Sequence, residues 1–246
     1  MLEVKSRFFK NRYFATKLSW LDIFHAIHYF NYLGGREHIP WYYSKKVGVS
    51  CVSDLTLGID KVMAGMKSNT RNEIRRAIKE GCTFDIDDDV DAFVPYYNDF
   101  CRSKGLNDYT SKARIQKYKD ILSTRVEHNG IVLARHINIL DKIGKNAFLM
   151  FSCSPRLEEN VDRRLIGWAN KFLHYKDLEW LANAGFEKYD WSGICLDEND
   201  ERYSIGQFKL SFGGVITHPL MLRTPLYWLF ERFRTMIMYI RKVSAQ

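Results

Sequence analysis

The sequence predicts a mixed α/β fold in which one mostly antiparallel sheet is flanked by helices. Segments of β-branched and apolar residues alternate with segments of helical period along most of the chain, which is typical of a sheet covered by helices. Two apolar runs, 130–139 and 146–153, are joined by a turn that contains Asp141 and Gly144, which indicates an antiparallel hairpin. Hydrophobic residues make up 46% of the 246 residues and charged residues 27%, a composition that excludes a disordered chain.

The individual elements follow from periodicity and from the residues that begin and end helices. Apolar residues at helical spacing over 18–32 predict a short helix. Thr70 and Glu73 have the spacing of a capping box, and Gly81 stands where a glycine ends a helix. The remaining expected elements are strands at 47–59 and 82–86, helices at 89–104 and 110–122, strands at 130–139 and 146–153, a helix at 163–184, a strand at 186–191, a helix at 199–212, a strand at 215–222 and a helix at 225–242.

Three segments are expected along the chain. Residues 1–45 are basic and aromatic, and we expect them to form an N-terminal extension packed on the main domain. Residues 46–224 form that domain, and residues 225–246 form a C-terminal amphipathic helix. The chain has no internal repeat and no proline- or serine-rich linker, so no seam between the segments is obvious.

The charge balance favours an anionic partner. The chain carries 37 Lys+Arg against 29 Asp+Glu, a net charge of +8 with a pI of about 9.1. The five cysteines are odd in number and far apart, which suits a reducing compartment and excludes a zinc ribbon. No run approaches the ~18 apolar residues of a membrane span, and the first residues lack the apolar core of a signal peptide. We therefore expect a cytoplasmic protein.

A phosphate-binding motif is expected where the run 146–153 leads into the next helix. Arg164, Gly167 and Ala169 form the pattern R-x-x-G-x-A at the opening of that helix. A helix N-terminus offers unpaired N–H groups and the positive end of the helix dipole, and small residues let a pyrophosphate approach the backbone. The alternative is an ordinary helix start with Gly167 packed against the sheet.

Several segments carry a resemblance to a known family. The R-x-x-G-x-A pattern between a strand and a helix resembles the coenzyme A site of acyltransferases of the GNAT superfamily. The stretch 164–193, which ends in Y-D-W-S-G, resembles the FemABX-like branch of that superfamily, as do F-K-L-S-F-G at 208–213 and the basic helix at 67–81. Members of this branch add amino acids to peptidoglycan precursors or acylate other amines. The resemblance implies a single GNAT-like domain. Because FemABX ligases carry two such halves and this chain has room for about one, it favours an acyl-CoA donor.

The resemblance places the donor at the strand end and the helix start. Backbone N–H groups near Phe151 and Cys153 are expected to polarise the oxyanion of acyl transfer. The motif is expected to bind acyl-CoA, with acetyl-CoA as the simplest donor, and no metal is expected. The motif residues are Arg164, Leu165, Ile166, Gly167, Trp168 and Ala169.

Four residues are candidates for the chemistry, and each has a simpler alternative. Lys209, within F-K-L-S-F-G, either holds phosphate and stabilises the oxyanion or is a surface lysine. Tyr203 lies where many GNAT enzymes have a tyrosine that protonates the leaving thiolate. Asp190 either orients the acceptor amine or accepts hydrogen bonds from the backbone at a strand end. His136 is either a general base or a histidine satisfied within the sheet.

Three residues are candidates for binding the acceptor. Arg75 belongs to a basic stripe on the helix 67–81, which is either a wall for a phosphate-bearing acceptor or a solvated face. Trp191 ends the strand 186–191 beside Asp190, and Lys209 is the third candidate. The resemblance implies an acceptor amine on an amino sugar or a cell-wall precursor, carried by a nucleotide or a lipid.

These observations leave three hypotheses for the function. The first is an N-acyltransferase in which the acceptor amine attacks acyl-CoA directly. The second is an aminoacyltransferase of the FemABX type that uses aminoacyl-tRNA, which the basic pI permits. The third is a non-catalytic, membrane-associated binding protein built on a GNAT scaffold.

The C-terminal helix has two interpretations. It either lies on the inner face of the membrane near a lipid-linked acceptor, or packs on the catalytic domain. Its apolar stripe is Leu226, Leu229, Phe230, Phe233, Ile237 and Ile240, its rings are Trp228 and Tyr239, and its cations are Arg232, Arg234, Arg241 and Lys242.

Overall fold

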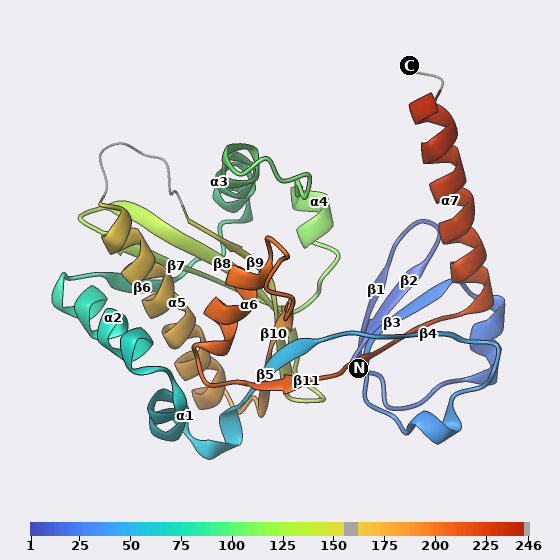
Figure 1. The fold of residues 1–246 in the computed structure, drawn as a ribbon, viewed down its shortest axis with the longest axis horizontal. Coiled ribbons are helices and arrows are strands. Elements are labelled where there is room, and N and C mark those ends of the chain that lie inside the picture. The colour runs from blue at the N-terminus through green and yellow to red at the C-terminus, as the bar shows by residue number, and fades with distance from the viewer. Residues whose placement is uncertain (155–161, 244–246) are drawn as a thin grey trace. The chain divides into compact units, whose positions relative to one another are not determined.

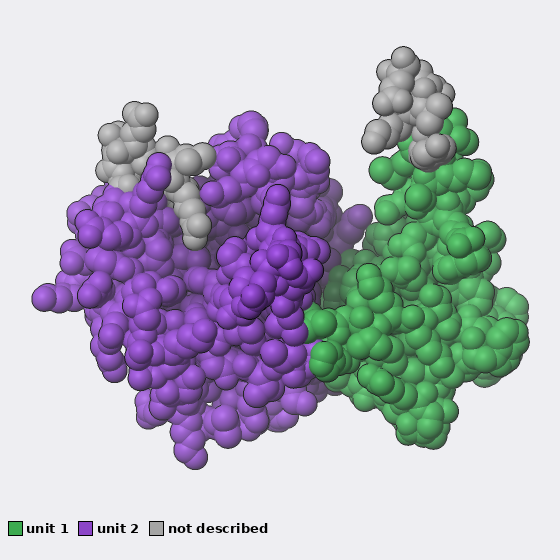
Figure 2. All heavy atoms as spheres, in the orientation of Figure 1, with its two compact units in different colours: residues 1–49, 218–246 green, residues 50–217 purple. Residues whose placement is uncertain are grey.

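The computed structural model describes residues 1–154 and 162–243 (Figure 1). The side chains of Tyr239, Arg241 and Lys242, which the sequence places on the C-terminal helix, lie outside the described part. The chain divides into two compact units (Figure 2): unit 1 holds residues 1–49 and 218–246, and unit 2 holds residues 50–217. This division differs from the three segments that the sequence predicts, because the two ends of the chain fold together.

Unit 2 is built on a sheet that, in the described residues, has seven strands in the order β11-β5-β10-β9-β8-β7-β6. Neighbouring strands run antiparallel except β10 and β9, which are parallel. The expected hairpin is confirmed, since β8 pairs with β9 from Arg135–Cys153 to Asp141–Asn146. The strands are β5 (Ser50–Asp54), β6 (Thr83–Ile86), β7 (Ile121–His128), β8 (Ile131–Asp141), β9 (Asn146–Cys153), β10 (Lys188–Gly193) and β11 (Val215–Thr217).

Helices cover both faces of this sheet (Figure 1). One apolar core joins the strands to α1, α2 and α5, and a second core joins β8 and β9 to α3 and α4. The long helix α5 crosses β7 and β8 and packs along α2. The helical elements are η3 (Leu55–Leu57), α1 (Ile59–Gly65), α2 (Ser68–Lys79), α3 (Val90–Ser103), α4 (Lys112–Ile115), α5 (Arg163–Asn183) and α6 (Tyr203–Leu210).

Unit 1 has its own sheet and core. In the described residues its strand order is β1-β2-β3-β12-β4, with the β2–β3 pair parallel and the others antiparallel. Among the described residues no helix, including the terminal α7, is long and apolar enough to cross a membrane. The elements are β1 (Leu2–Lys5), β2 (Lys10–Tyr13), η1 (Trp20–Phe24), β3 (Ile27–Tyr32), η2 (Arg36–His38), β4 (Ser44–Val47), β12 (Leu220–Arg223) and α7 (Pro225–Val243).

The predicted mixed, mostly antiparallel α/β fold is confirmed, but it holds two sheets where the sequence predicts one. The segment 18–32 is not a helix. It forms η1 and the strand β3, because Asp22 interrupts the apolar periodicity and the following aromatic and β-branched residues favour a strand. The expected helix 110–122 shortens to α4, and Ile121 begins β7.

Two predicted strands are each divided between the units. The segment 47–59 contains the end of β4 in unit 1 and β5 in unit 2, and its last residues, expected as strand, instead form η3 and the start of α1. The segment 215–222 separates into β11 of unit 2 and β12 of unit 1. Pro219 ends the ladder in the second segment because proline has no N–H to donate. The expected capping box is also wrong. α2 begins at Ser68, and the Thr70 hydroxyl instead donates to Ser211 Oγ at 3.0 Å.

Candidate active site

The candidate site begins where β10 separates from β9. The parallel pairing runs from Lys188–Asn146 to Asp190–Phe148 and goes no further among the described residues. Beyond this point β10 carries an irregularity between Asp190 and Gly193, and Ser192 adopts a φ of 67°. Ser192 is held there by its hydroxyl, which donates to Leu149 O, and by its N–H, which donates to Asp190 Oδ1 at 2.8 Å. A left-handed serine costs free energy, and such strain clusters at functional sites.

The Asp190 carboxylate is buried and held in place. Besides the Ser192 N–H, its Oδ1 accepts a hydrogen bond of 2.5 Å from the Ser50 hydroxyl, which also donates to Ser192 O at 2.8 Å. Ser50 of β5 thus holds both the Asp190 carboxylate and the Ser192 backbone at the end of β10. These backbone and hydroxyl contacts hold the Asp190 carboxylate at the strand end and fix a negative charge beside the site.

Lys209 of α6 lies at the same strand end. Its Nζ donates to the carbonyl of Gly193, the last residue of β10, at 3.0 Å. Burial lowers the pKa of Lys209 to about 8, although the nearby carboxylate of Asp190 and the thiol of Cys51 act in the opposite direction. Burial in turn raises the pKa of the Cys51 thiol to about 11. A half-buried lysine that titrates near neutral pH can both carry a positive charge and give up a proton.

An aromatic wall stands beside Lys209. The ring of His174 on α5 contacts Trp191 with centroids 5.1 Å apart, Phe208 at 5.4 Å and Phe212 at 5.3 Å. Trp191, predicted to bind the acceptor, is fully buried and donates its indole N–H to Ser53 Oγ at 2.9 Å. It therefore forms the wall behind the site and presents no surface to a ligand.

A buried polar network continues behind His174. Its ring contacts that of His136 at a tilt of 35° with centroids 4.1 Å apart, and His136 Nδ1 lies 2.7 Å from Asp177 Oδ2. His136 Nε2 lies 3.3 Å from Asn170 Oδ1, so both ring nitrogens of this buried residue are engaged. Asp177 also accepts a hydrogen bond from Thr124 at 2.7 Å. The structure therefore gives His136 the structural role that was the alternative to a general base.

His136 and His174, which are 38 residues apart in the sequence, lie together with Asp177 in the structure. Ligand atoms of His136, His174 and Asp177 all lie within 4.8 Å of one another, a donor set that suits a transition metal. Asp177 already accepts hydrogen bonds from Thr124 and His136, which a cation would have to displace. His174 is different, because its Nδ1 is buried without a hydrogen-bond partner among the described residues. Burial, with the nearby His136 and Lys209, holds the pKa of His174 well below its usual range.

The R-x-x-G-x-A pattern opens α5 as expected. α5 begins at Arg163, and a Cβ placed on Gly167 would meet no heavy atom of the described residues within 4 Å. Gly167 is therefore not required for packing against the sheet, which removes the simpler interpretation of this glycine. Gly206 on α6 shows the contrast, since a Cβ there would lie 2.5 Å from Cys195 O. The helix start also holds Asp162, whose carboxylate accepts the Arg164 N–H at 2.8 Å.

The other motif residues serve different roles. The side chain of Arg164 is 81% exposed beside Asp162, while Ile166 and Ala169 are buried in the core. Leu165 and Trp168 are partly buried against the same core. The guanidinium of Arg76 lies 5.4 Å from the centre of the Trp168 ring, which ties this turn of α5 to α2.

Four predicted residues lie outside the Lys209 cluster. Phe151 and Cys153 are buried in the core beneath α3, and burial raises the pKa of the Cys153 thiol, so only their backbone can face a ligand. Tyr203 donates to Glu198 at 3.1 Å at the surface, a hydrogen bond that raises the pKa of its hydroxyl. Arg75 is exposed on α2 and donates to Asn72 at 3.2 Å.

Sequence reasoning missed Ser50, Cys51 and His174. Ser50 and Cys51 come from a strand that is distant in sequence, and nothing in their local pattern marks them. His174 had a signal, because it lies seven residues after Gly167 and thus on the same side of α5. Lys209 and Asp190 are brought together as the sequence suggests, with Trp191 behind them.

The fold can be compared with known proteins. No family model matches the sequence, and no curated protein is significantly similar to it. FemX superposes with a TM-score of 0.69 at 12% identity, over 93% of this chain and 85% of FemX. The chain has a GNAT-like fold of the FemABX type. The C-terminal domain of a putative lysylphosphatidylglycerol synthetase from Agrobacterium fabrum matches with a TM-score of 0.62 at 12% identity, over 94% of this chain and 84% of that chain.

The similarity to known structures extends over residues of both units. L-PGS from Bacillus licheniformis superposes with a TM-score of 0.53 at 11% identity, over 82% of this chain and 68% of that chain. A match to FemX over 93% of the chain must include residues of both units, because unit 1 holds 1–49 and 218–246. The likeness is thus not confined to the unit that carries Lys209.

Proposed function

We propose that the chain is an acyltransferase that moves an acyl group from acyl-CoA to an acceptor amine by direct attack. The observation that carries this proposal is the half-buried Lys209 at the point where β10 leaves β9, with a pKa of about 8. A lysine desolvated beside a fixed carboxylate and an aromatic wall is typical of a catalytic cleft and unusual for a surface residue.

The chemical step needs one positive charge and two proton transfers. The amine nitrogen attacks the thioester carbonyl, the new C–N bond forms, and the carbonyl oxygen becomes an oxyanion. Protonated Lys209 stabilises that oxyanion. The C–S bond then breaks, the thiolate takes a proton from Lys209, and the amine proton passes through water to restore the lysine.

The free edge of β9 supplies the second stabilising group in this proposal. Leu149 O accepts from the Ser192 hydroxyl, but residues 150–153 have no strand partner in β10 among the described residues, so their backbone groups on that edge can pair with a ligand. An N–H near Phe151 or Cys153 would then donate to the oxyanion from the side of the sheet, while Lys209 acts from α6.

The opening of α5 supports a donor with a pyrophosphate. Space is open around Gly167, and the positive end of the α5 dipole attracts phosphate. For the acceptor we propose an amino sugar or cell-wall precursor linked to a nucleotide or a lipid. Exposed cations on α2, Arg75 among them, could bind its phosphate.

A substitution at Gly167 tests the donor. We expect Gly167→Val to remain folded because a Cβ at this position meets no heavy atom of the described residues within 4 Å, but the valine occupies the space we assign to pyrophosphate. We expect the Kd for CoA, measured by calorimetry, to rise tenfold or more. Gly65→Val on α1 is the matched control, since a Cβ on that helical glycine also meets nothing within 4 Å. Unchanged CoA binding in Gly167→Val would show that the motif is not the donor site.

The pH dependence tests Lys209. Because protonated Lys209 acts on the oxyanion, kcat should fall as pH rises through about 8. Lys209→Arg keeps a charge that persists to much higher pH, so its residual activity should not show this fall. A wild-type profile flat from pH 7 to 9.5 would exclude Lys209 from the chemistry.

One observation favours a second donor. The Asp162 carboxylate accepts a hydrogen bond from the Arg164 N–H at the start of α5. Its negative charge would repel a pyrophosphate there. An aminoacyl-tRNA presents its ester to Lys209 without placing phosphate at this helix. Transfer from charged tRNA, together with no detectable CoA binding to the wild type, would establish this donor in place of acyl-CoA.

A further inference from the structure

The net positive charge of the chain resides in unit 1. Residues 1–49 and 218–246 contain 13 Lys+Arg and 4 Asp+Glu, a net charge of +9. Residues 50–217 contain 24 Lys+Arg and 25 Asp+Glu, a net charge of −1. The proposed chemistry lies in the nearly neutral unit, so the basic character of the protein needs a separate explanation.

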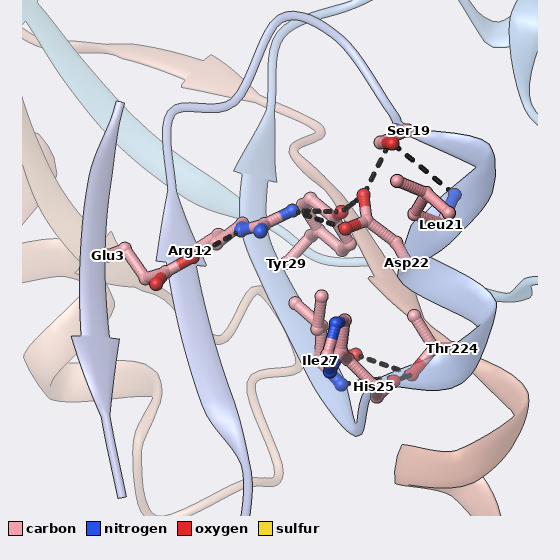
Figure 3. A network of polar contacts seen from close by, with 9 residues as sticks. All are labelled: Glu3, Arg12, Ser19, Leu21, Asp22, His25, Ile27, Tyr29 and Thr224. Carbon is pink, nitrogen blue, oxygen red and sulfur yellow. Dashed lines mark hydrogen bonds and ion pairs between the residues drawn. The ribbon is translucent and has the colours of Figure 1, made fainter.

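Unit 1 holds a turn of large apolar side chains at its surface. In η1, Trp20 is 70% exposed, Leu21 49% and Phe24 62%. The same turn buries Asp22, which accepts hydrogen bonds from Tyr29 at 2.5 Å and from Arg12 Nη1 at 2.9 Å (Figure 3). A buried charge network thus fixes the turn that displays these residues. The network therefore holds Trp20, Leu21 and Phe24 in a position where they are exposed to water. An exposed group of large apolar side chains is typical of a surface that binds a partner.

The helix α7 continues this surface. Its start is fixed by Thr224, whose hydroxyl accepts the Ile27 N–H at 2.9 Å and donates to His25 O at 2.7 Å (Figure 3). Its first turns pack on the N-terminal segment, where Phe9 contacts Tyr227 with centroids 5.6 Å apart.

Beyond these turns the helix exposes apolar side chains. Leu229 and Phe233 are each 58% exposed and Met236 is 50% exposed, with the cations Arg232 and Arg234 exposed between them. α7 packs against η1 within unit 1, so the two sets of apolar residues belong to neighbouring elements.

We infer that η1 and α7 form a docking surface for an anionic phospholipid membrane. Trp, Phe and Leu side chains insert at the level of the headgroups, while the cations of a +9 unit face anionic lipid. The aliphatic and thioether side chains Leu21, Leu229 and Met236 argue against nucleic acid, which offers no apolar surface to them. The net charge argues against a second copy, because two such units repel each other. This inference does not depend on the reaction assigned to unit 2.

The experiment is co-sedimentation of the full chain with vesicles of two compositions. We expect binding to vesicles of phosphatidylcholine with 30% phosphatidylglycerol, as a test composition, and little binding to phosphatidylcholine alone. Trp20→Ser/Phe24→Ser and Leu229→Ser/Phe233→Ser should each reduce the partition coefficient at least tenfold. Because these side chains are exposed, both variants should keep the wild-type Tm. Trp41→Ser is the matched control, since Trp41 is 91% exposed in the same unit but lies outside η1 and α7.

A charge variant tests the electrostatic part separately. Arg232→Gln/Arg234→Gln should lower the partition coefficient by about fivefold for each cation removed. Equal binding to both kinds of vesicle, or an equal loss in Trp41→Ser, would overturn the inference. So would binding of unfractionated tRNA, measured by fluorescence anisotropy, that depends on Trp20 and Phe24 while vesicle binding is absent. Light scattering that shows a dimer disrupted by the same substitutions would assign the surface to self-association instead.

Discussion

Replacing Lys209 with methionine should abolish activity and at the same time stabilise the protein at neutral pH. The structure gives the reason for the second effect. Burial lowers the pKa of Lys209 from 10.5 to about 8, even with the attraction of Asp190, so the folded state disfavours the charged lysine. Methionine has a similar length without the charge, and it can pack on Phe208 and Phe212.

The size of the gain can be bounded from the pKa. One pKa unit corresponds to about 1.4 kcal/mol, so this shift sets a ceiling of about 3 kcal/mol on the penalty of the charge. The gain on removing the charge is smaller than this ceiling for two reasons. Lys209 is only half-buried, so solvent screens its charge, and the substitution also removes its hydrogen bond to Gly193 O, which is worth about 1 kcal/mol. We expect a net gain of about 1 kcal/mol at pH 7, or roughly 2–4 °C in Tm.

The pH dependence gives the sharper test. Between pH 8 and 10.5 the unfolded chain binds more protons at Lys209 than the folded chain, so wild-type stability rises with pH in this window. The free-energy cost of burying the charged lysine has its full value below pH 8. It is absent above pH 10.5, where the lysine is neutral in both the folded and the unfolded state. The advantage of Lys209→Met should therefore shrink as the pH is raised through that window.

The assay is urea unfolding followed by circular dichroism, at pH 7 and at several values up to pH 10.5. Lys61→Met, at an exposed lysine of α1, is the control and should show no pH-dependent difference. A Lys209→Met protein that is less stable at pH 7, or whose advantage does not change with pH, would refute the reasoning. Lys209 would then be an ordinary surface lysine.

Two further predictions concern the buried polar groups. Asp177→Ala should cost about 3–5 kcal/mol in urea unfolding, because it leaves His136 and Thr124 buried without their acceptor; a loss below 1 kcal/mol would contradict the network. In unit 1, burial acts to raise the pKa of Asp22, but the hydrogen bonds from Tyr29, Ser19 and Arg12 outweigh it and lower that pKa. The carboxylate therefore contributes stability that is present above about pH 4 and lost as the pH falls through its lowered value, so Asp22→Asn should flatten the acid limb of the unfolding curve; an unchanged acid limb would contradict this.

Much of unit 2 could be predicted from the sequence because its signals are local. The hairpin of β8 and β9 has two long apolar runs and a turn, and α5 has a helical pattern over 21 residues. The divided strands could not be predicted. The segments 47–59 and 215–222 each read as continuous, since nothing in a local pattern shows that the chain passes from one unit to the other. The pairing of the N-terminal strands with β12 joins residues nearly 200 positions apart.

The candidate site was predictable to the extent that its residues lie in short motifs. Lys209 and Asp190 stand in segments whose glycines and aromatics mark them, and the structure brings them together. Ser50 enters from β5, and its contact with Asp190 depends on the sheet order. The sequence also suggested that Trp191 binds the acceptor because it adjoins Asp190. Successive side chains of a strand point to opposite faces, so the neighbour of a site residue points away from the site. Trp191 alternates with Asp190 and lies in the core.

One side of α5 joins the two halves of the proposed site. Gly167, Asn170, His174 and Asp177 recur at intervals of three and four residues, so they follow one another along one side of the helix. Apolar residues at the buried positions 174 and 177 would bury more apolar surface, yet the chain has polar groups there. The Nδ1 of His174, which has no hydrogen-bond partner among the described residues, alone costs about 1–3 kcal/mol. Packing gains nothing from that nitrogen, and the His174 ring lies near both His136, with ring centroids 4.1 Å apart, and Lys209. Such a cost beside a lysine of lowered pKa is what we expect if this position serves the proposed acyl transfer and not stability.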